Sequence, residues 1–245
     1  MHLPSPLRRA AVLALAGAGL GLGFGLPAAA AAAAGATAPA SIPVADGRIE
    51  HVVARVTVSG TRAAPSDVRI ERWHTKDTAH GIRIDRRTGE VETEHVFGPG
   101  GSWIFDAATN RLRVDLRERG PAPESLAQEG ENLRRQVAAG AYAVTAETTV
   151  GTRAAVVLQS VPGVYRSDEP SSSTRILADK ETYIPYERTT SLPGGQFTQT
   201  TRIIKAEQLP LAGNARLLEL RRHPGARKIV VGAAKGQAGG KGARR

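Results

Sequence analysis

Short runs of alternating apolar and polar residues dominate the chain from residue 48 onward. In one such run, Val52, Ala54, Val56 and Val58 fall on the same side of an extended strand, with polar residues among those between them. Comparable runs follow at short spacing, separated by turn residues such as Gly, Pro and Asn. They span residues 68–74, 81–85, 90–97, 102–106 and 111–116. Short strands joined by tight turns predict an antiparallel meander.

One segment has helical periodicity instead. Ser125, with Gln128 three residues later, matches a capping box, in which hydroxyl and amide groups satisfy free N–H groups at a helix start. Leu126 and Leu133 then recur on one helical face. The pattern predicts one amphipathic helix over residues 126–139.

Strand patterns resume after this helix and continue to residue 205. They cover residues 141–149, 153–159, 175–179, 183–191 and 196–205. We expect residues 217–220 to close the sheet. A sheet with this many strands must curl, and a helix can cover its inner side. The predicted fold is mainly β (α+β): a curled antiparallel half-barrel sheet with one inserted amphipathic helix covering the concave face.

The N-terminal residues have the order of a secretory signal peptide. Arg8 and Arg9 precede an apolar run over 10–26, and small residues continue to Ala38. A membrane anchor is the alternative, but five glycines weaken a spanning helix. We therefore expect an exported protein, secreted or associated with the cell envelope. It has no lipid anchor, because the sequence contains no cysteine for lipid attachment. The export route stays open between the general secretory and twin-arginine systems.

The net charge of +10 comes from the two ends of the chain. Ten of the 33 Lys and Arg residues lie in 1–38 and 221–245, so the remaining 23 match the 23 acidic residues. We therefore expect no nucleic-acid partner. The predicted division is a signal peptide (1–38), a lead-in (39–47), one domain (48–220) and a basic disordered tail (221–245). The tail is either solubilising or binds an anionic cell-wall or membrane surface.

Candidate chemistry is sparse. No nucleophile, phosphate-binding or HExxH motif occurs, so we expect a non-enzyme without cofactors. His74, His80 and His95 could meet at one surface, but solvated strand histidines without a metal are the expectation. Glu90, Glu92 and Glu94 alternate on one strand, which favours a solvent-facing side over catalytic carboxylates. A secreted hydrolase is the remaining alternative.

The strand entry from Asp179 through Thr182 to Pro185 follows a D-x-x-T-x-x-P pattern, and Gln208-Leu209-Pro210 supplies a later "LP" segment. Through these motifs the C-terminal half resembles the bacterial lipoprotein-carrier family (LolA, LolB and RseB type). The resemblance covers roughly residues 48–220, most strongly from Leu133 onward. It is closest to uncharacterised secreted proteins of high-GC Gram-positive bacteria, and the excess of Arg over Lys suits such a source. The initial helix of the family has no counterpart here.

The resemblance implies a half-barrel whose concave face binds acyl chains or other apolar ligands. We therefore expect a monomeric, exported binding protein for a lipid or acyl chain. The alternative is an envelope sensor or protein-interaction module of RseB type that regulates a membrane partner. Strand parity alone selects five candidates for the ligand-binding surface: Val52, Val56, Ile84, Trp103 and Phe105.

Overall fold

The computed structural model describes residues 44–117, 124–162 and 172–231. These residues form one sheet and one α-helix, with two short 3-10 turns. The strands of the first half are β1 (Arg48–Ser59), β2 (Ser66–His74), β3 (Ala79–Asp85), β4 (Val91–Gly98), β5 (Gly101–Asp106) and β6 (Arg111–Asp115). Then come α1 (Leu126–Ala138), β7 (Tyr142–Val150), β8 (Arg153–Ser160), β9 (Ser173–Asp179), β10 (Pro185–Ser191), η1 (Pro193–Gly195), β11 (Thr198–Pro210), η2 (Ala215–Leu218) and β12 (Arg227–Val231).

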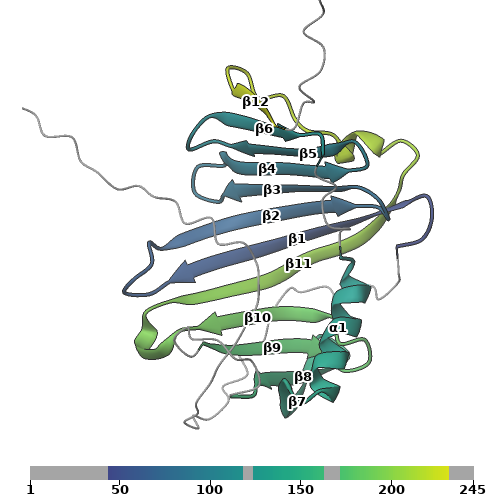
Figure 1. The fold of residues 1–245 in the computed structure, drawn as a ribbon. Helices are drawn as coiled ribbons and strands as arrows, with labels where there is room; N and C mark the ends of the chain where they lie inside the picture. The colour runs from purple at the N-terminus through teal and green to yellow at the C-terminus, as the bar shows by residue number, and fades with distance from the viewer. Residues whose placement is uncertain (1–43, 118–123, 163–171, 232–245) are drawn as a thin grey trace, which may run out of the picture.

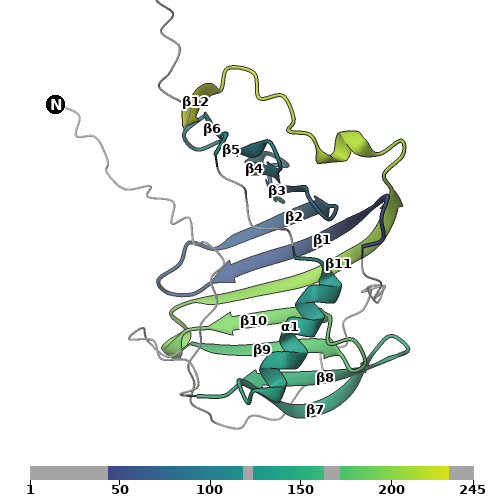
Figure 2. The same cartoon turned by 45° about the vertical axis from the view of Figure 1, so that its right-hand side comes forward.

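The sheet has 12 strands in the order β12-β6-β5-β4-β3-β2-β1-β11-β10-β9-β8-β7. Two antiparallel meanders, β1–β6 and β7–β11, meet where β1 pairs with β11 (Figure 1). All of these strand pairs are antiparallel except β12–β6, which is parallel. The sheet curls without closing, and α1 lies on its concave side (Figure 2). The predicted fold class is therefore confirmed.

Strand registers assign each side chain to one of two faces, because directly paired residues project to the same side. The concave face is the one that α1 covers, and it carries Val52, Val56 and Val68. The opposite, convex face carries Arg55 and Arg69, which are paired across β1 and β2. In this part of β1 and β2, valines thus lie on the inner side and charged residues on the outer side.

The helix α1 seals one half of the concave face. Its start has the predicted capping box: the Ser125 hydroxyl accepts from the Gln128 N–H, and the Gln128 amide oxygen accepts from the Ser125 N–H. Leu133 is buried against β8 and β9 in a cluster with Leu158 and Ile176. Gly130 permits the close approach, because a Cβ there would collide with the Thr182 carbonyl oxygen.

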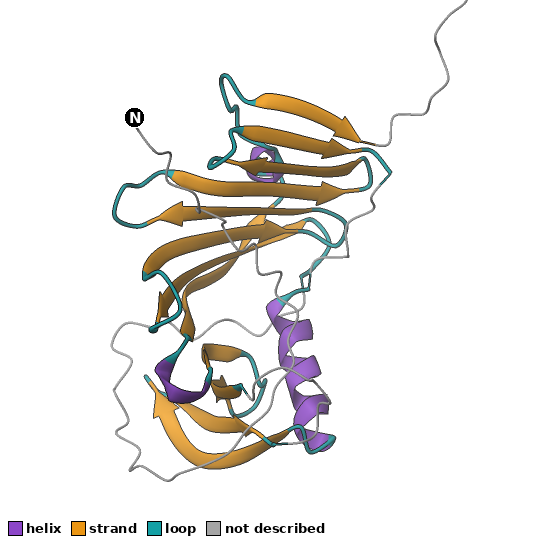
Figure 3. Ribbon diagram, turned by 60° about the vertical axis from the view of Figure 1, so that its left-hand side comes forward, coloured by secondary structure: helices purple, strands orange, loops and turns teal. Residues whose placement is uncertain are grey.

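A strap formed by residues 211–226 covers part of the convex face of the other half. It leaves the end of β11, forms η2 and reaches β12. Leu211, Leu217 and Leu218 pack against a cluster that includes Ile49 and Trp73. Figure 3 shows α1 against the lower half of the sheet and the short helical turn of the strap beside the upper strands. The two halves are therefore covered on opposite faces.

Two predictions about the C-terminal end were wrong. Residues 217–220 do not close the sheet; η2 and an extended segment occupy this stretch, because the leucines pack down onto the sheet. The segment 221–245 is not disordered throughout, since β12 adds to the edge strand β6. Residues 232–245, the signal peptide 1–38 and most of the lead-in 39–47 lie outside the described residues. Export and surface binding by the tail stay predictions.

Candidate functional site

The five predicted ligand-binding residues divide between the two faces. Val52 and Val56 lie on the concave face, and both are buried. Ile84, Trp103 and Phe105 project from the convex face. The two groups are separated by the sheet and cannot line one surface. Parity within each strand was assigned correctly, but it does not relate the faces of distant strands.

One row of side chains on the concave face includes polar residues. One register row crosses five strands and contains Val52, Arg72, Gly81, His95 and Ile104. We call these five residues the Arg72 row. It places a guanidinium group and an imidazole ring side by side on the inner surface, with an aliphatic residue at each end.

Gly81 allows the His95 ring to lie against the sheet. A Cβ at Gly81 would collide with ring atoms of His95, so a side chain there would displace the ring. Phe97 tilts against the other part of the ring, with centroids 5.3 Å apart. Burial, with repulsion from His80 and Arg72, lowers the pKa of His95 below its usual value. The ring is therefore neutral at neutral pH.

Arg72 has no ion-pair or hydrogen-bond partner within the described ranges, and its Nε is buried without a partner. Two other arginines of the same face differ. Arg83 Nε lies 2.5 Å from Glu92, and Arg113 is 3.2 Å from Asp115. Arg72 thus contributes an uncompensated positive charge to the inner surface.

Next to this row, a buried His74–Glu50 hydrogen bond lies at the start of α1. His74 Nε2 lies 2.6 Å from the Glu50 carboxylate, which also accepts from the Leu126 N–H. A carboxylate at a helix start is favoured by the unpaired N–H groups there. His74 was expected to be solvated. Instead it is 1% exposed, because its carboxylate partner is buried beside it.

On the convex face, Glu94 anchors the strap. Its side chain is fully buried and accepts from His80 Nε2 at 2.8 Å, His223 Nε2 at 2.8 Å and the Arg221 N–H at 2.7 Å. The expectation that Glu94 faces solvent was wrong, since the strap covers this position. His80 was also expected to be solvated and is buried with it.

Protonation in this cluster follows from its geometry. Burial alone would raise the pKa of Glu94, but hydrogen bonds from His80, Arg221 and His223 outweigh it and hold the pKa low. His80 Nδ1 lies 2.5 Å from the Leu217 carbonyl oxygen, so both ring nitrogens face acceptors. The cluster therefore links the strap to the sheet through a buried carboxylate and its hydrogen-bond partners.

The Asp179 motif has a structural role. One Asp179 carboxylate oxygen accepts from the Glu181 N–H and from the Thr182 N–H and hydroxyl, while the other accepts from Tyr186 and pairs with Arg153 at 2.8 Å. Burial and the Asp179 bond raise the pKa of Tyr186 to about 12. The motif fixes the β9–β10 turn on which α1 rests.

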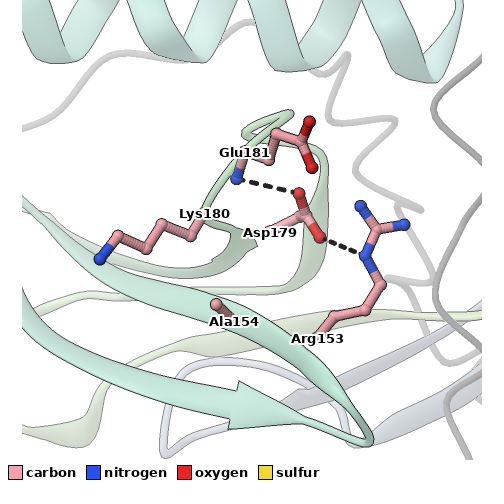
Figure 4. A pocket seen from close by; sticks show the side chains of 5 residues that line it. All are labelled: Arg153, Ala154, Asp179, Lys180 and Glu181. Carbon is pink, nitrogen blue, oxygen red and sulfur yellow. Dashed lines mark hydrogen bonds and ion pairs between the residues drawn. The ribbon is translucent and has the colours of Figure 1, made fainter.

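A small pocket opens beside this turn (Figure 4). Its lining comes from the ends of β8 and β9 and includes Arg153, Lys180 and Glu181. The Asp179 carboxylate is already occupied by the bonds of the turn. Burial would raise the pKa of Asp179, but the bonds from Thr182 and Tyr186, with the charge of Arg153, lower it. A firmly ionised, fully bonded carboxylate is a poor general base.

The described ranges contain no group of three or more His, Asp or Glu side chains that could hold a metal ion. No helix there is both long and apolar enough to span a membrane.

Comparison with known proteins gives a distant likeness in structure alone. No protein-family model matches the sequence, and no curated protein matches it. An uncharacterized conserved protein from Thermus thermophilus is similar over 73% of this chain and 90% of its own, with 11% identity and a TM-score of 0.43. The MucA/MucB complex of Pseudomonas aeruginosa gives 16% identity and a TM-score of 0.38 over 65% of this chain.

That match spans 52% of the Pseudomonas chain, about half its length. A LolA superfamily protein from Nitrosomonas europaea matches 66% of this chain and 86% of its own, at 9% identity and a TM-score of 0.29. The last name belongs to the family that the sequence resembles. With TM-scores below 0.5, we base no functional conclusion on these likenesses.

Sequence reasoning missed the Arg72 row and the Glu94 cluster. Arg72 shares its strand face with Val68 and Ile70, so its direction was readable from alternation. A charged residue in line with a valine and an isoleucine of the same strand was the available signal. No comparable signal marks Glu94, because His223 lies 129 residues away in the chain.

Proposed function

We propose that the protein is an exported, non-catalytic binding protein that holds an apolar ligand, a lipid or acyl chain, on its concave face. The observation that carries this proposal is the asymmetry of the sheet. Val56, Val68 and Ile70 lie on the concave face of the central strands, whereas the convex face there carries ion pairs such as Arg55–Asp67. Apolar ligand sites are concave and lined by such side chains.

The position of α1 supports the same proposal. The helix crosses the half of the sheet from β11 to β7, and its start reaches β1 and β11 (Figures 1 and 2). The concave face of β2–β5 lies beyond its reach. Among the described elements, the strap also packs on this half, but on the convex face. The part of the inner surface that we assign to the ligand is therefore the concave side of β2–β5, where Ile70 and Ile104 are half-buried.

The test is native mass spectrometry of the purified protein, followed by lipid extraction. We expect a bound lipid or acyl chain. Ile70→Gln places an amide on the concave face, and Val53→Gln places the same group on the convex face at a similarly half-buried position. The first variant should lose bound lipid and the second should keep it.

A protein that is empty in every preparation and binds no added fatty acid would refute the proposal. That outcome, together with recovery of an envelope protein in pull-downs, would favour the interaction-module alternative. Equal lipid loss in both variants would show that the concave face has no special part in binding.

A further inference from the structure

The Arg72 row offers more than an apolar surface. It combines an unpaired guanidinium, a neutral imidazole and aliphatic neighbours on the inner side of the sheet. We propose that this row binds the acidic head group, a carboxylate or phosphate, of an amphiphile whose acyl chain lies along the concave face. This inference rests on the proposed function and specifies the class of its ligand.

The charge of Arg72 is the first reason. Burying a charged group without a partner is costly, so such groups in proteins are normally paired. Arg83 and Arg113 on the same face follow this rule through Glu92 and Asp115. Arg72 departs from it: the residue is half-buried, and its buried Nε has no hydrogen-bond partner among the described residues. An anion is the partner that a guanidinium accepts with paired, charge-assisted hydrogen bonds.

His95 supplies a second donor beside it. A neutral imidazole carries one N–H, and His95 makes no hydrogen bond to the described residues. Because Gly81 has no side chain, the His95 ring occupies the space over Gly81, next to Arg72 in the row. A bound acid could thus accept from Arg72 and His95 together. The Glu50 carboxylate on the same face bonds to His74 and to the Leu126 N–H rather than to Arg72.

The surroundings identify the rest of the ligand. Ile104 lies at one end of the row and Ile70 continues the same face of β2, and both side chains are half-buried. A free inorganic anion would need none of these aliphatic contacts. An acyl chain would use them, since burying apolar area from water is favourable. The mixed surface therefore fits a molecule with one acidic end and one long apolar end.

The experiment compares four probes on the full processed chain by titration calorimetry: palmitate, hexadecyl phosphate, hexadecanol and inorganic phosphate. We expect the two acidic amphiphiles to bind about tenfold more tightly than hexadecanol, the gain of one charge-assisted interaction. Inorganic phosphate should bind far more weakly than hexadecyl phosphate. Comparing palmitate with hexadecyl phosphate shows which acid the site prefers.

Variants assign the gain to the row. Arg72→Gln should abolish the advantage of the acids and leave hexadecanol binding unchanged. Arg83→Gln, at an ion-paired arginine of the same face, should retain the advantage. Gly81→Ala gives an independent reading without removing the charge: its Cβ displaces the His95 ring and should reduce the advantage. Thermal unfolding of each variant verifies that it is folded.

The outcomes separate the two proposals. If hexadecanol binds as tightly as palmitate, or Arg72→Gln keeps the advantage of the acids, the head-group inference fails while the apolar-ligand proposal stands. If phosphate alone matches hexadecyl phosphate, the row is a simple anion site and the inference again fails. If no amphiphile binds, both proposals fail.

Discussion

The elements that cover the two halves of the sheet are held in place by different kinds of contact. Over β8 and β9, α1 lies on the concave face and is held by an apolar seam centred on Leu133. Over β2 and β3, the strap lies on the convex face and combines leucine contacts with the buried Glu94 cluster. Apolar contacts are non-directional, whereas the Glu94 cluster requires particular donors and protonation states. The strap should therefore respond more strongly than α1 to single polar substitutions.

The largest effect is expected in the apolar seam. Leu133→Asp would place a carboxylate among Leu158 and Ile176, where no basic partner is available among the described residues. Burying an unpaired charge should lower the free energy of unfolding by on the order of 3 kcal/mol or more. Chemical denaturation measures this loss.

The control for this variant is Gln136→Asp, which adds the same charge to an exposed position of α1. It should change stability by less than about 1 kcal/mol. Similar stabilities for Leu133→Asp and the original protein would mean that α1 does not pack on the sheet in solution.

Next in size is the release of the strap. Glu94→Gln keeps the shape of the side chain but removes its charge, leaving His80 and His223 with one weaker acceptor between them. An unsatisfied buried donor costs about 1–3 kcal/mol. The cost should fall on the strap, so trypsin should cleave faster after Arg216, Arg221 and Arg222 while α1 stays protected.

Glu92→Gln is the matched control, because Glu92 lies on the same strand but is partly exposed and pairs with Arg83. It should leave the cleavage rate within the strap unchanged. Equal cleavage in both variants would show that Glu94 does not hold the strap.

Acid should weaken both halves, through one carboxylate in each. Hydrogen bonds lower the folded pKa of Glu94 and Asp179 below their ordinary values of 4.5 and 3.8. The unfolded state therefore binds protons first as pH falls. The stabilisation is complete above those ordinary values and is lost below them, as pH falls through the folded pKa values.

Denaturation midpoints between pH 7 and pH 3 test this prediction. The midpoints should decrease once the pH is below about 5, where the carboxylates of the unfolded chain begin to protonate. Glu94→Gln should make the decline shallower, because one of the responsible groups no longer titrates. A decline of the same steepness in this variant would remove Glu94 from the explanation.

What could be predicted from the sequence follows the same division. The strands and α1 were predictable because alternation and helical spacing are local patterns, and the capping box at Ser125 marked the helix start. Leu217 and Leu218 were misassigned to a strand, since two adjacent leucines do not separate an extended segment from a 3-10 turn. Glu94 was misassigned because its environment is created by the strap, which no local pattern reveals.

Whether the candidate ligand residues lie on the same face of the sheet could not be predicted for a related reason. Parity relates Val52 to Val56 within one strand, but relating either to Trp103 requires the register of four successive strand pairs. Those registers depend on the turns and on packing across the whole sheet. Arg72 could be placed beside Ile70 from the sequence. That it has no partner among the described residues could be seen only when the neighbouring strands were in place.

The smallest effect is expected at the start of α1, where the capping box adds polar contacts to the apolar packing of the helix. Ser125→Ala removes the hydroxyl that accepts from the Gln128 N–H at 3.1 Å, and should cost about 1 kcal/mol. Gln128→Ala removes the reciprocal bond to the Ser125 N–H. Because each residue bonds the backbone of the other, the double variant should lose less stability than the sum of the two single losses if the box acts as a unit. Chemical denaturation of the four proteins gives this coupling. The Glu50 carboxylate remains bonded to the Leu126 N–H in all of them, so the helix start keeps one anchor and the loss should stay small. A loss as large as that of Leu133→Asp would mean that the helix half, like the strap, is held chiefly by its polar contacts.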